Sequence, residues 1–146
     1  MNMCKVDFIS CPAFSFSKEK IIRFLKKYAE DEGYVVSQIQ YNFLDKPSML
    51  KLNNQYLNHD NHTDIITFDY SEKKTIKAEV YISIETMKEN AKTFGQPIEY
   101  EAIRLISHAL FHCMGYSDNN DIEKEKMRSI EGRFINDVSR ETIDNV

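Results

Sequence analysis

The stretch Ile106-Ser-His108-Ala-Leu-Phe-His112-Cys-Met-Gly115-Tyr-Ser-Asp118 decides how the rest of the chain is interpreted. His108 and His112 are four residues apart in a segment of helical periodicity, so both imidazoles lie on one helix face, about 6 Å apart. Gly115 permits the left-handed turn that ends a helix. Asp118 then supplies a carboxylate, and two nitrogens with one carboxylate are a common catalytic zinc set. The alternative is a pair of partly buried polar histidines without a ligand.

The residue after the first histidine argues against one class of enzyme. Metalloproteases carry HExxH, in which the glutamate acts as general base. Ala109 occupies that position here, so a peptidase of this mechanism is disfavoured. Cys113 is expected to pack as a small apolar residue, and Tyr116 is expected to be structural rather than catalytic.

The segments around this helix predict a single α+β domain in which strands come early and helices late. Four stretches rich in β-branched or alternating apolar residues are expected to be strands: 5–9, 34–43, 65–70 and 76–84. The last two are expected to pair as a hairpin. Helices are expected at about 17–31, from 45 or 46, at 85–95, at 96–115 and from 120 onward. The predicted fold is a small, mostly four-stranded sheet packed with about five helices, one of which carries the HxxxH pair.

Length and composition limit the possible classes of protein. The chain has 146 residues and a formal net charge of −4, which fits one globular domain and argues mildly against binding nucleic acid by charge alone. No apolar run approaches the ~18 residues of a membrane span, and no secretory signal is evident. Three cysteines without metal-type spacing fit a reducing compartment. We therefore expect a cytoplasmic protein without a membrane partner.

The charge is unevenly distributed. Residues 1–27 carry six basic and two acidic side chains, a balance of +4, whereas residues 28–146 carry 13 and 21, a balance of −8. Lys26 and Lys27 belong to a basic cluster within residues 18–27. Such a cluster is either a solvated helix face or a local track for phosphates.

Several motifs together resemble the YbeY family of bacterial metal-dependent endoribonucleases. The family's helix reads H-G-x-L-H-x-x-G-Y-D-H, and residues 108–118 match its first two histidines and its Gly-Tyr pair. Residues 52–68 resemble the family's L-N-x-x-Y…D…T-D-V-L-S-F segment, and residues 79–86 its G-D-I-x-I-S-x-E passage. Residues 127–131 resemble part of its last helix, so the similarity spans roughly residues 45–132.

This resemblance implies that residues 1–146 form a single metallohydrolase domain. The implied activity is single-strand-specific endoribonucleolytic cleavage in 16S rRNA maturation and ribosome quality control. One zinc ion, or another divalent metal, is implied as cofactor, with a metal-bound water held by His108, His112 and Asp118 as the catalytic group. Ribosomal RNA and the small ribosomal subunit are the implied partners, and no DNA is expected.

Two departures from the family pattern affect these expectations. Asp118 stands in place of the third histidine, which makes the site harder and favours competition by other divalent ions. Leu57 stands where the family usually has an arginine, a residue that clamps phosphate through two hydrogen bonds. The second departure leaves open an assembly factor that binds RNA and whose metal site is mainly structural. A metal hydrolase of another ester or amide also remains open.

Three other positions are candidates for the cleft or for RNA contacts. Asp64 lies in the family-like segment before the third strand and either orients a ligand or caps a turn. His59 is either an exposed loop histidine or a substrate contact, and the same holds for His62. Lys26 and Lys27 are the candidates for a phosphate track.

Overall fold

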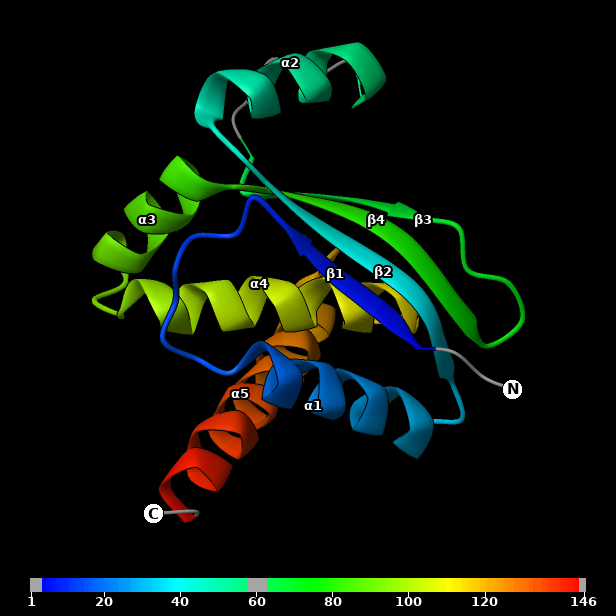
Figure 1. Ribbon diagram of the computed structural model, residues 1–146. Coiled ribbons are helices and arrows are strands. Elements are labelled where there is room, and N and C mark those ends of the chain that lie inside the picture. The colour runs from blue at the N-terminus through cyan, green and yellow to red at the C-terminus, as the bar shows by residue number, and fades with distance from the viewer. Residues whose placement is uncertain (1–3, 58–62, 145–146) are drawn as a thin grey trace.

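The computed structural model describes residues 4–57 and 63–144, which form a four-stranded sheet and five helices (Figure 1). The elements follow in the order β1 (Lys5–Ile9), α1 (Lys18–Asp31), β2 (Val35–Leu44), α2 (Lys46–Leu57), β3 (Ile65–Asp69), β4 (Thr75–Ser83), α3 (Ile84–Thr93), α4 (Ile98–Cys113) and α5 (Asp121–Asp144). The predicted α+β class is confirmed, with boundaries that differ from the expected ones by a few residues.

The sheet is mixed, with the strand order β1-β2-β4-β3. β2 pairs in parallel with both β1 and β4, while β3 runs antiparallel to β4 at one edge. The turn between β3 and β4 passes through Lys73 and Lys74, both with positive φ. This pairing confirms the hairpin expected between the third and fourth strands.

One face of the sheet carries the core. Ile39, Tyr41 and Phe43 alternate along β2 and are buried, as expected for a strand with one covered face. α1, α4 and α5 lie on the same side of the sheet, and α2 lies apart from them beyond its end (Figure 1). The Tyr41 hydroxyl donates a hydrogen bond of 2.8 Å to the Ile106 carbonyl and so ties the sheet to α4.

Side-chain caps fix where four of the helices begin, and at α3 the Ser83 hydroxyl accepts a hydrogen bond from the Thr86 amide. The side chains of Ser17, Asp45 and Asn120 accept hydrogen bonds from backbone amides in the first turns of α1, α2 and α5. The hydrogen bonds from Ser48 also lower the pKa of Asp45. Asn120 therefore caps α5, and the Glu123 carboxylate accepts a hydrogen bond from the Ser117 hydroxyl.

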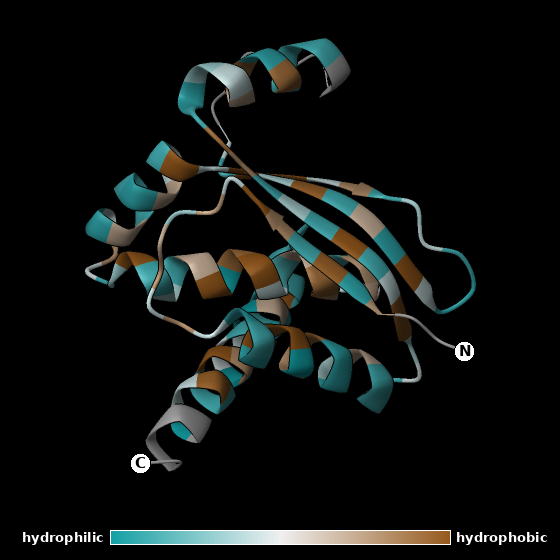
Figure 2. Cartoon of the chain, viewed as in Figure 1, coloured by the Kyte–Doolittle hydropathy of each residue, from teal (hydrophilic) through white to brown (hydrophobic). Residues whose placement is uncertain are grey.

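α4 is the central helix of the molecule. Its residues facing the sheet and the neighbouring helices are buried, and Figure 2 shows that its apolar segments lie beneath the strands. A central helix that is apolar on most sides leaves only a narrow stripe for polar side chains. Among the described residues, no helix is both long and apolar enough to cross a bilayer.

Candidate active site

The polar stripe of α4 holds four side chains that matter for chemistry: Glu101, Arg104, His108 and His112. Their spacing of three or four residues places them on one face of the helix. Glu101 is buried, Arg104 and His108 are partly exposed, and His112 is exposed. The stripe therefore runs from a buried acid to an exposed imidazole, and the predicted histidine pair lies at its exposed end.

Glu131 on α5 links two members of this stripe. Its carboxylate lies 2.6 Å from Nδ1 of His108 and 3.3 Å from Nη1 of Arg104, and the side chain is only 2% exposed. The Nδ1–H of His108 thus donates to a buried carboxylate, which leaves Nε2 as the nitrogen available to a ligand. Histidines that bind metals are commonly held in this way by a carboxylate on the other ring nitrogen.

Sequence reasoning did not assign Glu131 this role. The sequence nevertheless contains a signal, because Met127, Ile130 and Phe134 recur at helical spacing, and residue 131 lies four positions after 127 and three before 134. A carboxylate on the buried face of a helix requires a partner. Its position opposite the histidine helix could not be obtained from spacing alone.

Arg104 is held by carboxylates from α4, from α5 and from the segment before β3. Its guanidinium donates two hydrogen bonds to Glu101, of 2.8 and 2.7 Å, and lies 3.7 Å from Asp64. The hydrogen bonds with Glu101, followed by the nearby negative charges, raise the pKa of Arg104 above its ordinary value despite burial. Arg104 therefore stays protonated and fixes the two acids and Glu131 around it.

Asp64 joins this network from the segment before β3. Its carboxylate accepts a hydrogen bond of 3.2 Å from Asn90 on α3, and its backbone carbonyl accepts one of 3.0 Å from Ser83. Burial raises the pKa of Asp64, and the positive charge of Arg104 opposes that shift. Asp64 thus connects α3, α4 and the start of β3, which places it beside the predicted site.

α4 ends at Cys113, just before the glycine that the sequence predicted to end it. Gly115 has a φ of 98°, and hydrogen bonds run from its amide to His112 and from the Tyr116 amide to Phe111. This is the hydrogen-bond pattern of a Schellman motif. Asp118 follows in the exposed loop between α4 and α5 and makes no hydrogen bond or ion pair with any described residue.

The three predicted metal ligands are not gathered around one point. Within residues 4–57 and 63–144, no group of three His, Cys, Asp or Glu side chains is arranged to hold a metal ion. The donor chemistry nevertheless fits a metal, because His108 is held at Nδ1 by Glu131 and His112 lies one turn further along the same face. Asp118 is a carboxylate that no described neighbour holds in place. Its part in a metal site stays a prediction.

Most of the chain matches one known family. The model of the family described as endoribonuclease YbeY matches residues 9–139. The chain belongs to this family. The endoribonuclease YbeY of Phocaeicola vulgatus is 37% identical over 118 residues, covering 81% of this chain and 86% of that protein. The endoribonuclease YbeY of Flavobacterium psychrophilum is 46% identical over 94 residues, covering 64% and 67%.

A solved structure shares the fold. The solution structure of TM1509 from Thermotoga maritima matches with a TM-score of 0.69 at 22% sequence identity, covering 96% of this chain and 93% of that one. At this identity the likeness concerns the fold, which the two proteins share over almost their whole lengths. The family resemblance expected from the motifs is confirmed.

The other residues predicted to contact RNA either lie away from the polar stripe or fall outside the described residues. Lys26 and Lys27 are exposed on α1, and Lys27 pairs with Asp31 at 3.0 Å. His59 and His62 lie outside the described residues, and nothing is described of the Leu57 side chain.

Cys113 is buried as expected. Tyr116 donates a hydrogen bond of 2.9 Å to Glu32, which ties the end of α4 to the end of α1 and favours its structural role.

Proposed function

We propose that this chain is a metal-dependent, single-strand-specific endoribonuclease that acts in 16S rRNA maturation and ribosome quality control in the cytoplasm. The observation that carries the proposal is the His108–Glu131 contact of 2.6 Å on the polar stripe of α4, in a chain of the endoribonuclease YbeY family. A buried carboxylate behind one histidine of an HxxxH pair is how metal sites orient their ligands.

Each residue of the site has a role in the proposed reaction. His108 and His112 would hold the metal through imidazole nitrogens, with a carboxylate oxygen of Asp118 from the loop after α4 as the third ligand. Glu131 orients His108, and Arg104 holds Glu131 in turn. A metal held there would supply Lewis acidity toward a phosphoryl oxygen and would lower the pKa of a bound water to about 7. Asp64 keeps the start of β3 beside Arg104.

Zinc is the metal proposed, since imidazole nitrogens suit it and the site combines two of them with one carboxylate. The oxygen ligand also admits manganese or magnesium more readily than a site of three histidines. No acidic residue follows His108 at position 109, so the chain offers no general base there.

The function is tested by cleavage of a single-stranded fragment of 16S rRNA. Purified protein is analysed for its metal content and is then incubated with the fragment, with and without a chelator. We expect cleavage that stops with chelator and returns with added zinc, while a fully double-stranded RNA of the same length stays intact. Cleavage that persists in chelator would contradict the proposal.

A second candidate is an assembly factor that binds ribosomal RNA and whose metal site is mainly structural. Leu57 favours it, because the family usually has a phosphate-clamping arginine at that position. The net charge of −4 also makes unaided capture of RNA weak. The same experiment distinguishes the two candidate functions. A zinc-loaded assembly factor would bind the RNA fragment and leave it uncut.

A further inference from the structure

A cavity of about 400 Å³ lies between the end of α3, the first half of α4 and the middle of α5. Its lining includes Phe94, Gln96, Tyr100, Arg104, Arg128 and Ile135. Arg104 and Glu131 belong both to this lining and to the candidate active site. Tyr100 and Arg104 precede His108 by eight and four residues on α4, or about 12 and 6 Å along the helix axis. The cavity is therefore the direct continuation of the site along the polar stripe.

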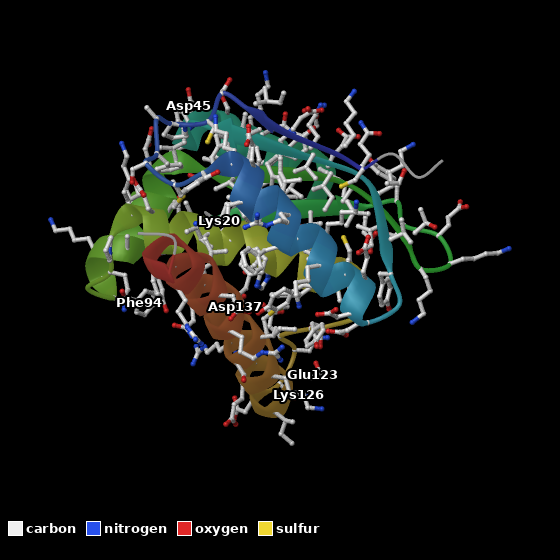
Figure 3. The ribbon with its side chains drawn as sticks, turned by 60° about the horizontal axis from the view of Figure 1, so that its bottom comes forward. Lys20, Asp45, Phe94, Glu123, Lys126 and Asp137 are labelled. Carbon is white, nitrogen blue, oxygen red and sulfur yellow. The ribbon has the colours of Figure 1, made fainter. Side chains whose placement is uncertain are left out.

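Two aromatic rings border this cavity. Phe94 follows α3, is 70% exposed and makes no ring contact with any described residue. Figure 3 shows Phe94 at the outer margin of the molecule, near the end of α3. Tyr100 lies in the first turn of α4, after the short connection from α3, and is partly exposed. Single-stranded RNA is recognised by stacking of unpaired bases on exposed aromatic rings of this kind.

One guanidinium at the cavity has no ion-pair partner among the described residues. Glu101 and Glu131 both form ion pairs with Arg104, and Glu131 also contacts His108. Arg128 is exposed and forms no ion pair with any described residue. The cavity therefore offers one uncommitted guanidinium, which can bind a phosphate through two parallel hydrogen bonds.

We propose that this cavity is a nucleotide subsite that holds a residue of single-stranded RNA next to the scissile bond. The base stacks on Phe94 and Tyr100, and its phosphate binds Arg128. The inference rests on the proposed endoribonuclease function. It assigns to this cavity part of the phosphate binding that Leu57 cannot provide.

The test measures binding rather than cleavage. A short fluorescein-labelled single-stranded RNA is titrated with the full chain in chelator, which prevents metal-dependent cleavage, and fluorescence anisotropy is recorded at several salt concentrations. We expect Phe94→Ala to weaken binding about tenfold, since the RNA base no longer stacks on an aromatic ring. Arg128→Glu should weaken binding and reduce the salt slope by about 0.7, the value for one phosphate of a single strand.

Matched variants control for exposure and charge. Tyr70→Ala removes another exposed aromatic ring, beside the β3–β4 hairpin, and Arg140→Glu reverses a charge further along α5. Both should bind the RNA like wild type. The subsite is overturned if Phe94→Ala binds like wild type, or if Arg128→Glu binds no more weakly than Arg140→Glu. A wild type that binds no single-stranded RNA would instead contradict the proposed function itself.

Discussion

Glu131 shows how one buried carboxylate can organise a site. An isolated charge at 2% exposure would cost several kcal/mol, because the interior solvates ions poorly. Arg104 and His108 offset that cost from opposite sides of the carboxylate. The same contacts determine which nitrogen of His108 faces outward. The contacts that stabilise the buried Glu131 carboxylate therefore also orient the His108 ring.

Glu131→Gln tests this role at the level of metal affinity. The amide keeps the size of the side chain but loses the charge that holds His108, so we expect zinc affinity to fall by about 10- to 100-fold. The measurement is a competition titration with a chromophoric chelator. Glu125→Gln, on the exposed side of the same helix, is the control and should bind zinc like wild type. Equal affinities in Glu131→Gln and Glu125→Gln would show that the contact is only structural.

Asp64 gives a prediction for pH. Burial raises its pKa in the folded chain, so the folded state binds a proton more readily than the unfolded state does. The stabilisation from this proton is present below the unfolded pKa of about 3.9 and is lost as pH rises through the raised folded value. Asp64→Asn removes this titration. Urea unfolding should show wild type gaining stability relative to Asp64→Asn as pH falls from neutral; a constant difference would contradict the burial effect.

The ends of the elements show where sequence reasoning succeeds. Ser17, Asn120 and Gly115 mark helix ends through local hydrogen bonding and backbone geometry, which neighbouring residues determine. The hairpin followed from two adjacent strand patterns. The sheet order could not be obtained in this way, because the parallel pairing of β2 with β4 joins segments separated by α2 and β3. Local signals predict elements, whereas packing of distant apolar faces determines their order.

Two glycines allow a paired test at this scale. Gly115 has a φ of 98°, so Gly115→Ala forces an L residue into the left-handed region and should lower the free energy of unfolding by about 1–2 kcal/mol. Gly132 lies inside α5 without positive φ, and an added Cβ meets nothing within 4 Å. Gly132→Ala should raise the free energy of unfolding by about 0.5–1 kcal/mol. Urea unfolding of both variants checks the opposite signs, and a shared sign would refute the explanation.

Across the whole molecule, the net charge of −4 conceals a division between a +4 segment at residues 1–27 and a −8 remainder. Part of the negative charge is used internally, since Glu101, Glu131 and Asp64 surround Arg104. The basic cluster of residues 18–27 lies on α1, whose buried face packs on α4 and α5 (Figure 1). Recognition of RNA is therefore expected to depend on local patches rather than on total charge.

The double variant Lys26→Glu/Lys27→Glu tests the patch on α1. We expect weaker binding of single-stranded RNA and a flatter dependence of the binding constant on salt, by about 0.7 in the logarithmic slope for each phosphate that the variant no longer binds. Lys73→Glu/Lys77→Glu changes the same charge at the β3–β4 hairpin and is the control. If both double variants give the same slope, the α1 cluster is only a solvated helix face.

The candidate site was only partly predictable from the sequence. The histidine pair follows from a spacing of four on one helix, and the family motifs point to the same residues. The support from Glu131 and Arg104 depends on how α5 crosses α4, and the contact of Asp64 depends on the sheet edge reaching α4. These are tertiary contacts between distant segments, so they cannot be predicted from the periodicity of either segment.

Zinc titration of wild type and His112→Ala tests the central claim most directly. His112 is exposed, so its removal should leave the fold intact, which circular dichroism can verify. We predict one zinc ion per wild-type chain and at least tenfold weaker binding in His112→Ala, with His108→Ala behaving alike. Zinc bound by His112→Ala as tightly as by wild type would contradict the assignment of the site to α4.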